Sequence, residues 1–113
     1  MHEVGIIEST LTVAQARARA AGATRIDAIH LRVGSLTGVV PEALDHAFTA
    51  LRQGTLAHGA RLVVEYVTAV CWCAACQSEF EAPGLFSECP ACGTASGDIR
   101  RGRELDLISL EVE

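Results

Sequence analysis

The stretch that decides the fold is CAACQSEFEAPGLFSECPAC, residues 73–92, which begins and ends with a CxxC pair. Structural Zn²⁺ sites hold the ion with four ligands at the corners of a tetrahedron, and thiolates are preferred donors. One CxxC turn offers the thiolates of Cys73 and Cys76, and the second offers those of Cys89 and Cys92. We therefore predict a structural Zn²⁺ bound by these four cysteines. Iron in the same sulfur cage, free thiol pairs and disulfides are the alternatives that the spacing leaves open.

The cysteine count and the start of the chain indicate the compartment. Five cysteines are an odd number, so a closed set of disulfides would leave one unpaired, and Cys71 is the spare beside the zinc motif. Glu3 and Glu8 interrupt the apolar positions near the start, which is not typical of a signal peptide. No stretch has the roughly 18 consecutive apolar residues that a membrane span needs. We expect a cytoplasmic protein without a membrane partner, where paired cysteines usually bind metal.

The segment that contains the cysteines, residues 69–101, is poor in large hydrophobic residues and needs the metal to hold it together. The sequence around it has regular periodicity. Apolar residues recur at helical spacing over 2–21 and 41–51, and alternate as in strands over 25–33, 61–68 and 104–112.

These segments predict an α+β fold, in which two helices pack on a small three-stranded mixed sheet and a zinc-ribbon module is inserted. The expected domains are an α+β domain over residues 1–68 plus 102–113 and a zinc-binding ribbon domain over 69–101.

The second candidate site is the start of the chain, Met1-His2-Glu3. The α-amino nitrogen, the following amide nitrogen and the imidazole of His2 can close two fused chelate rings on one metal ion. The amide or the carboxylate of Glu3 could supply a fourth donor. Planar nitrogen and oxygen donors favour Ni(II) or Cu(II) over Zn(II). The alternative is an ordinary helix start, with Glu3 near the favourable end of the helix dipole.

The rest of the sequence offers no catalytic constellation. His30, His46 and His58 are best interpreted as surface or hydrogen-bonded histidines, and no nucleophile–base arrangement or phosphate-binding loop stands out. The formal net charge of −5 argues against a nucleic-acid partner, which normally requires a basic face. We therefore expect a protein that is not an enzyme.

Taken together, these motifs resemble the HypA/HybF family of hydrogenase nickel-incorporation proteins nearly from end to end. The resemblance rests on the opening Met1-His2-Glu3, the loop VGSLTGV at 33–39, the helix at 41–51, GTLA at 54–57, the two CxxC pairs and the closing GREL at 102–105.

The resemblance implies a metallochaperone with a structural zinc ribbon, binding Ni²⁺ through His2, its neighbouring backbone and sometimes Glu3. Implied partners are the GTPase HypB and the large subunit of nickel–iron hydrogenase, with urease maturation for some members. Some members have an acidic residue where this chain has Val40, so Glu3 or Glu42 would serve instead, or the site has one donor fewer. A zinc-ribbon adaptor without nickel transfer is the alternative function, and the sequence leaves a monomer and a weak homodimer both open.

Overall fold

The computed structural model describes residues 2–113, which form two compact units. The first unit comprises residues 2–31, 39–65 and 106–113, and the second comprises 32–38 and 66–105. The chain therefore crosses from one unit to the other four times, after residues 31, 38, 65 and 105.

The first helix of the first unit is α1 (His2–Ala20), which ends where Gly22 takes a φ of 77°. A positive φ favours glycine, and the Gly22 amide donates to the carbonyl of Arg19, as is usual at a helix C-terminus. The predicted apolar face is confirmed for four residues that are buried, namely Ile7, Leu11, Ala14 and Ala18. Val4, which belongs to the same periodic pattern, is 43% exposed because it lies beside a surface groove described below.

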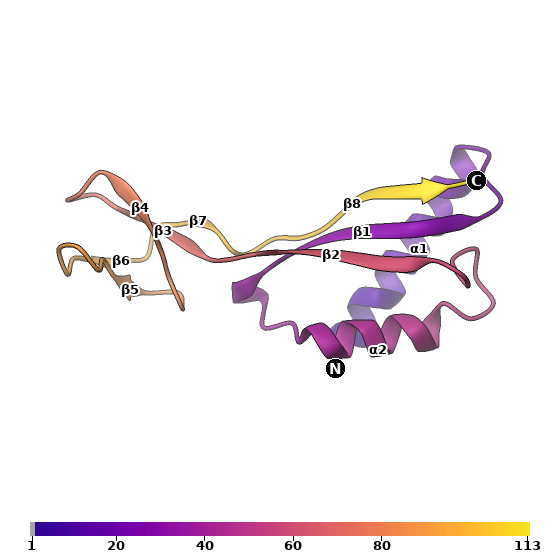
Figure 1. The fold of residues 1–113 in the computed structure, drawn as a ribbon, viewed down its shortest axis with the longest axis horizontal. Coiled ribbons are helices and arrows are strands. Elements are labelled where there is room, and N and C mark those ends of the chain that lie inside the picture. The colour runs from indigo at the N-terminus through magenta and orange to yellow at the C-terminus, as the bar shows by residue number, and fades with distance from the viewer. Residues whose placement is uncertain (1) are drawn as a thin grey trace. The chain divides into compact units, whose positions relative to one another are not determined.

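The three-stranded sheet has the order β2-β1-β8. Its strands are β1 (Ile26–Gly34), β2 (Arg61–Val67) and β8 (Leu105–Val112). β1 and β2 run in the same direction and β8 runs in the opposite one (Figure 1), which confirms the predicted mixed sheet. The connection from β1 to β2 contains α2 (Pro41–Leu51), which packs against α1. The predicted fold class is confirmed.

The core of the first unit lies along the central strand and the inner faces of the two helices. Ile26 and Ile29 of β1 and Leu44 of α2 are completely buried. The edge strand β8 is less well covered, since Ile108 is 41% and Val112 is 39% exposed. The alternation in β8 is therefore that of a strand whose apolar face is only partly covered.

The second unit contains the ribbon. A three-stranded sheet of order β4-β3-β7 is formed by β3 (Val70–Cys73), β4 (Ser78–Glu81) and β7 (Ile99–Arg101), and both outer strands pair antiparallel with β3. A second, two-stranded sheet is formed by β5 (Ser87–Glu88) and β6 (Ala95–Ser96). The short 3₁₀ helix η1 (Ser35–Thr37) also belongs to this unit.

Three chain segments meet closely at the base of the ribbon, at Gly34, Ala69 and Gly102. A Cβ atom on Gly34 would lie 2.1 Å from the carbonyl carbon and oxygen of Gly102, and one on Gly102 would lie 2.6 Å from the Cα of Ala69. The Gly34 amide donates to the carbonyl of Glu104 at 2.8 Å, and the Ala69 amide donates to the hydroxyl of Ser35 at 2.9 Å. The two glycines therefore allow the backbones to touch, and hydrogen bonds fix them there.

Candidate metal centres

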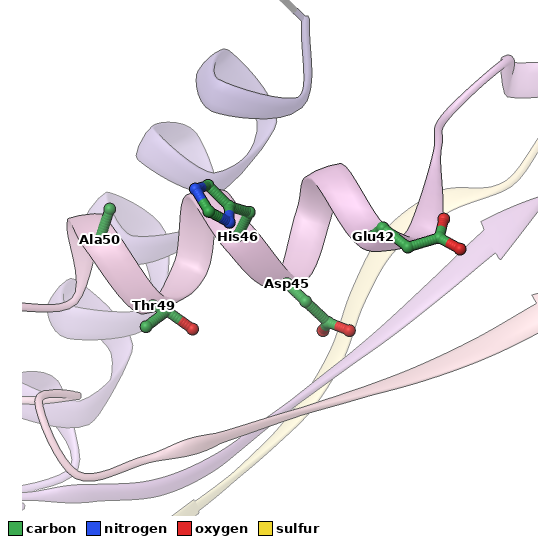
Figure 2. A pocket seen from close by; sticks show the side chains of 5 residues that line it. All are labelled: Glu42, Asp45, His46, Thr49 and Ala50. Atoms are coloured by element: carbon green, nitrogen blue, oxygen red, sulfur yellow. The ribbon is translucent and has the colours of Figure 1, made fainter.

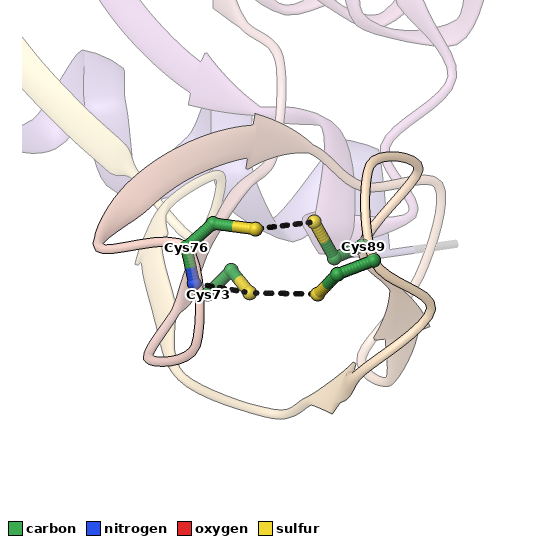
Figure 3. A group of neighbouring side chains, drawn as sticks. Cys73, Cys76 and Cys89 are labelled. Atoms are coloured by element: carbon green, nitrogen blue, oxygen red, sulfur yellow. Dashed lines mark hydrogen bonds between the residues drawn. The ribbon is translucent and has the colours of Figure 1, made fainter.

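The four predicted zinc ligands lie together at one end of the ribbon. Their sulfur atoms are all within 4.8 Å of one another, with 3.5 Å between Cys73 and Cys92 and 3.9 Å between Cys76 and Cys89. Figure 3 shows Cys73 and Cys76 facing Cys89 across the space between two loops. A tetrahedral Zn²⁺ with sulfurs at about 2.3 Å would separate each pair of sulfurs by about 3.8 Å. The donor set and its spacing therefore fit zinc.

The two CxxC turns have matching backbone geometry. The residue after each second cysteine has a left-handed conformation, with a φ of 55° at Gln77 and 77° at Gly93. In the first turn the amide of Cys76 donates to the sulfur of Cys73 at 3.4 Å. Gln77 is the one non-glycine residue with positive φ in the described chain. The first turn therefore has a left-handed conformation at a residue whose side chain disfavours it.

The thiols differ in how easily they lose their protons. Hydrogen bonds with the side chain and backbone of Thr94 lower the pKa of Cys92 to about 6, whereas hydrogen bonds with Cys92, Cys73 and Cys89 raise the pKa of Cys76 to about 12. Four sulfurs this close repel one another when ionised, so some protons stay bound until a cation replaces them. Metal binding here must therefore release protons, as is general for thiolate sites.

Cys71 is not part of this group. It is fully buried in β3, paired with Phe80 of β4 and Ile99 of β7. The spare cysteine is therefore a buried thiol on the strand that leads into the ribbon. Beside it, the ring of Trp72 lies under the guanidinium of Arg100 at 4.6 Å, a contact that packs β3 against β7.

The second candidate site lies at the start of α1. Met1 lies outside the described residues, so its predicted role as a nickel ligand has no structural description. His2 begins the helix with 54% of its side chain exposed, and its Nε2 lies 3.5 Å from Oε2 of Glu3. The structure thus brings the side chains of His2 and Glu3 together.

Glu3 is held by the start of the other helix. It is only 7% exposed, and its Oε2 accepts a hydrogen bond from the backbone amide of Val40 at 3.0 Å. This amide is the main reason that the pKa of Glu3 falls to about 2, a fall that burial opposes. Glu3 is therefore negatively charged at neutral pH. The sequence showed no sign of this contact, because Glu3 and Val40 are 37 residues apart.

A mainly apolar groove of about 640 Å³ borders Glu3 between the two helices of the first unit. Its exposed walls include Val4 and Val40, and Glu42 and His46 of α2 line it as well. The groove explains why Val4 is exposed at a position where the periodicity places an apolar face.

Within the part of the chain that the structure describes, the other acidic and histidine side chains do not gather into a second group of potential metal ligands. Figure 2 shows Glu42, Asp45 and His46 pointing in different directions from α2, so they do not converge on one point. His30 has a carboxylate partner, because its Nε2 lies 2.7 Å from Oε2 of Glu111. Among residues 2–113, the four cysteines are the one group of three or more potential ligands close enough to share an ion. Within that same range, no helix is both long and apolar enough to span a bilayer.

Comparisons with known proteins agree with this geometry. Residues 1–112 match the model of a protein family described as "Hydrogenase/urease nickel incorporation, metallochaperone, hypA". Proteins named "Hydrogenase maturation factor HypA" are similar over almost their whole length. The one from Picosynechococcus sp. is 47% identical (99% of each chain covered), and the one from Geobacter metallireducens is 41% identical (100% of each). The solution structure of the Ni metallochaperone HypA from Helicobacter pylori has the same fold, with a TM-score of 0.67, 22% identity and coverage of 97% and 96% of the two chains.

Proposed function

The chain belongs to the HypA family of hydrogenase and urease nickel-incorporation metallochaperones, and from this premise we propose that it binds Ni(II) at Met1-His2-Glu3, with the amide or the carboxylate of Glu3 as the fourth donor. It is a metal carrier for hydrogenase maturation and not an enzyme. We further propose that Cys73, Cys76, Cys89 and Cys92 are the ligands of its structural Zn²⁺.

The observation that carries the nickel proposal is the exposed imidazole of His2 beside a buried, anchored Glu3. The α-amine of Met1, the amide nitrogen of His2 and its imidazole supply nitrogen donors in one plane, which suits Ni(II). A site with few ligands at an exposed helix start can also release its metal to another protein. A closed set of four thiolates has no open position and suits a permanent ion.

In this proposal the α+β domain, residues 1–68 plus 102–113, carries the nickel, and the ribbon domain, residues 69–101, carries the zinc. The GTPase HypB and the large subunit of nickel–iron hydrogenase are the proposed partners, and urease maturation proteins are further candidates. The proposed compartment is the cytoplasm, where the cysteines stay reduced and available to the metal.

The test is the metal content of untagged protein after dialysis against Ni(II). We expect about one Ni(II) per chain in addition to zinc for the unaltered protein. His2→Ala, or a tag left ahead of Met1, is expected to abolish nickel binding and leave zinc unchanged, because each removes a nitrogen donor or blocks the amine. Elemental analysis and isothermal titration calorimetry measure both metals.

His58→Ala is the matched control, since His58 is an exposed histidine of the same unit, in the loop before β2. It should bind nickel as the unaltered protein does. Full nickel uptake by both His2→Ala and the tagged protein would contradict the proposed site and would favour the zinc-ribbon adaptor.

A further inference from the structure

The start of α2 lacks the usual means of capping a helix. Its N-cap residue, Val40, has extended backbone angles (φ −92°, ψ 119°) and no side chain that could accept a hydrogen bond. In a capping box, the residue three positions later returns a carboxylate or amide oxygen to the backbone N–H of the N-cap. That position is Ala43 here, so the Val40 N–H has no local side-chain acceptor.

Glu3 supplies the missing acceptor from a different helix. Its Oε2 accepts the Val40 N–H at 3.0 Å, and the same oxygen lies 3.5 Å from Nε2 of His2. The side chain of Glu3 is 9% exposed, so it is turned into the protein, whereas the imidazole of His2 is largely exposed. One carboxylate oxygen thus joins the first turn of α1, the start of α2 and the candidate nickel ligand.

We propose that the Glu3 side chain is a positioning residue and not a nickel ligand. By capping α2 it fixes the first turn of α1, and with it the backbone and imidazole of His2, in the arrangement that receives the metal. This inference rests on the proposed nickel site at the N-terminus. It also bears on position 40, where some family members have an acidic residue and this chain has Val40. A Glu3 carboxylate that is bound to the Val40 amide does not replace the missing oxygen ligand, so either Glu42 replaces it or the site has one donor fewer.

Three variants of the full-length, zinc-loaded protein separate the two roles. Glu3→Ala removes the acceptor, Glu3→Gln keeps a neutral acceptor oxygen, and Val40→Pro removes the N–H donor but leaves the carboxylate in place. The φ of Val40, −92°, is within about 30° of the −65° that proline requires, and its extended backbone suits a residue that precedes Pro41. Zinc content and circular dichroism check that each variant is folded.

We expect Glu3→Ala and Val40→Pro each to weaken Ni(II) binding by about 10- to 100-fold, as is typical when a group that orients a metal ligand is lost. Glu3→Gln should stay within a few-fold of the unaltered protein. The double variant Glu3→Ala/Val40→Pro should be no weaker than either single one, because both remove the same hydrogen bond. The visible spectrum of the saturated nickel complex should be the same in all variants, since the donor atoms do not change.

Glu8→Ala, which removes an exposed glutamate from the same helix, is the control and should bind nickel normally. Equal losses in Glu3→Ala and Glu3→Gln, with normal binding by Val40→Pro and an altered spectrum, would show that the carboxylate is a ligand and would overturn the inference. Lower thermal stability of Glu3→Ala with unchanged nickel affinity would also overturn it. If Val40→Pro does not fold, the comparison of Glu3→Ala with Glu3→Gln decides alone. In each of these outcomes nickel binding still depends on His2, so the proposed function stands. If His2→Ala bound nickel normally, the proposed function itself would be contradicted.

Discussion

Replacing Cys73 by serine is expected to release the zinc and unfold the ribbon. Cys73 is completely buried, and its sulfur accepts the Cys76 amide and lies 3.5 Å from the sulfur of Cys92. The sheets of the ribbon are short, and β5 and β6 have two residues each. In small zinc modules, metal binding supplies about 10–16 kcal/mol of apparent folding free energy, far more than such short strands supply. Elemental analysis would show the zinc loss, and amide hydrogen exchange would show lost protection over residues 69–101.

Cys71→Ala is the matched control for this experiment. Cys71 is also a buried cysteine of β3, but it lies outside the group of four sulfurs. Its replacement should leave the zinc stoichiometry unchanged, although the smaller side chain costs some packing energy. Cys73→Ser protein that keeps one zinc and native exchange protection would contradict the assignment of Cys73 as a ligand.

The second large effect is expected from Gly34→Ala. The φ of −83° at Gly34 is open to any residue, so the backbone conformation itself poses no problem. The added methyl group would instead lie 2.1 Å from the backbone of Gly102. A backbone clash cannot be relieved by rotating a side chain, so the segments must separate. The hydrogen bonds from Gly34 to Glu104 and from Leu36 to Gly102 would then be lost.

We expect this substitution to destabilise the protein by about 3 kcal/mol or more, at the upper end for overpacking. Thermal unfolding followed by circular dichroism should show a fall in Tm on the order of 10 °C. Gly59→Ala is the control, because a Cβ there meets no atom within 4 Å and the φ of Gly59 is not positive. A Tm of Gly34→Ala within a degree or two of the control would show that the close approach is not required.

Much of the fold could be predicted because its signals are local. Periodic apolar residues, with Gly22 and Gly54 just beyond the helices, indicate where α1 and α2 lie. Alternation indicates the three strands of the larger sheet. The four sulfurs could be predicted as a group because two CxxC turns determine which residues can share a tetrahedral ion.

The remaining features depend on contacts between distant residues. The bond from Val40 to Glu3 joins residues 37 positions apart, and neither residue type by itself indicates the other. The sequence alone indicates only an ordinary loop glycine at Gly34, because its close approach to Gly102 is seen only in the structure. Likewise, the periodicity of α1 includes Val4 among the apolar positions but cannot show that the neighbouring helix leaves it uncovered.

The alternation of the two units along the chain has a consequence for biosynthesis. Residues 106–113, which carry most of the edge strand β8, leave the ribosome after every cysteine of the ribbon. The ribbon can therefore take up its zinc before the sheet of the first unit gains its last strand.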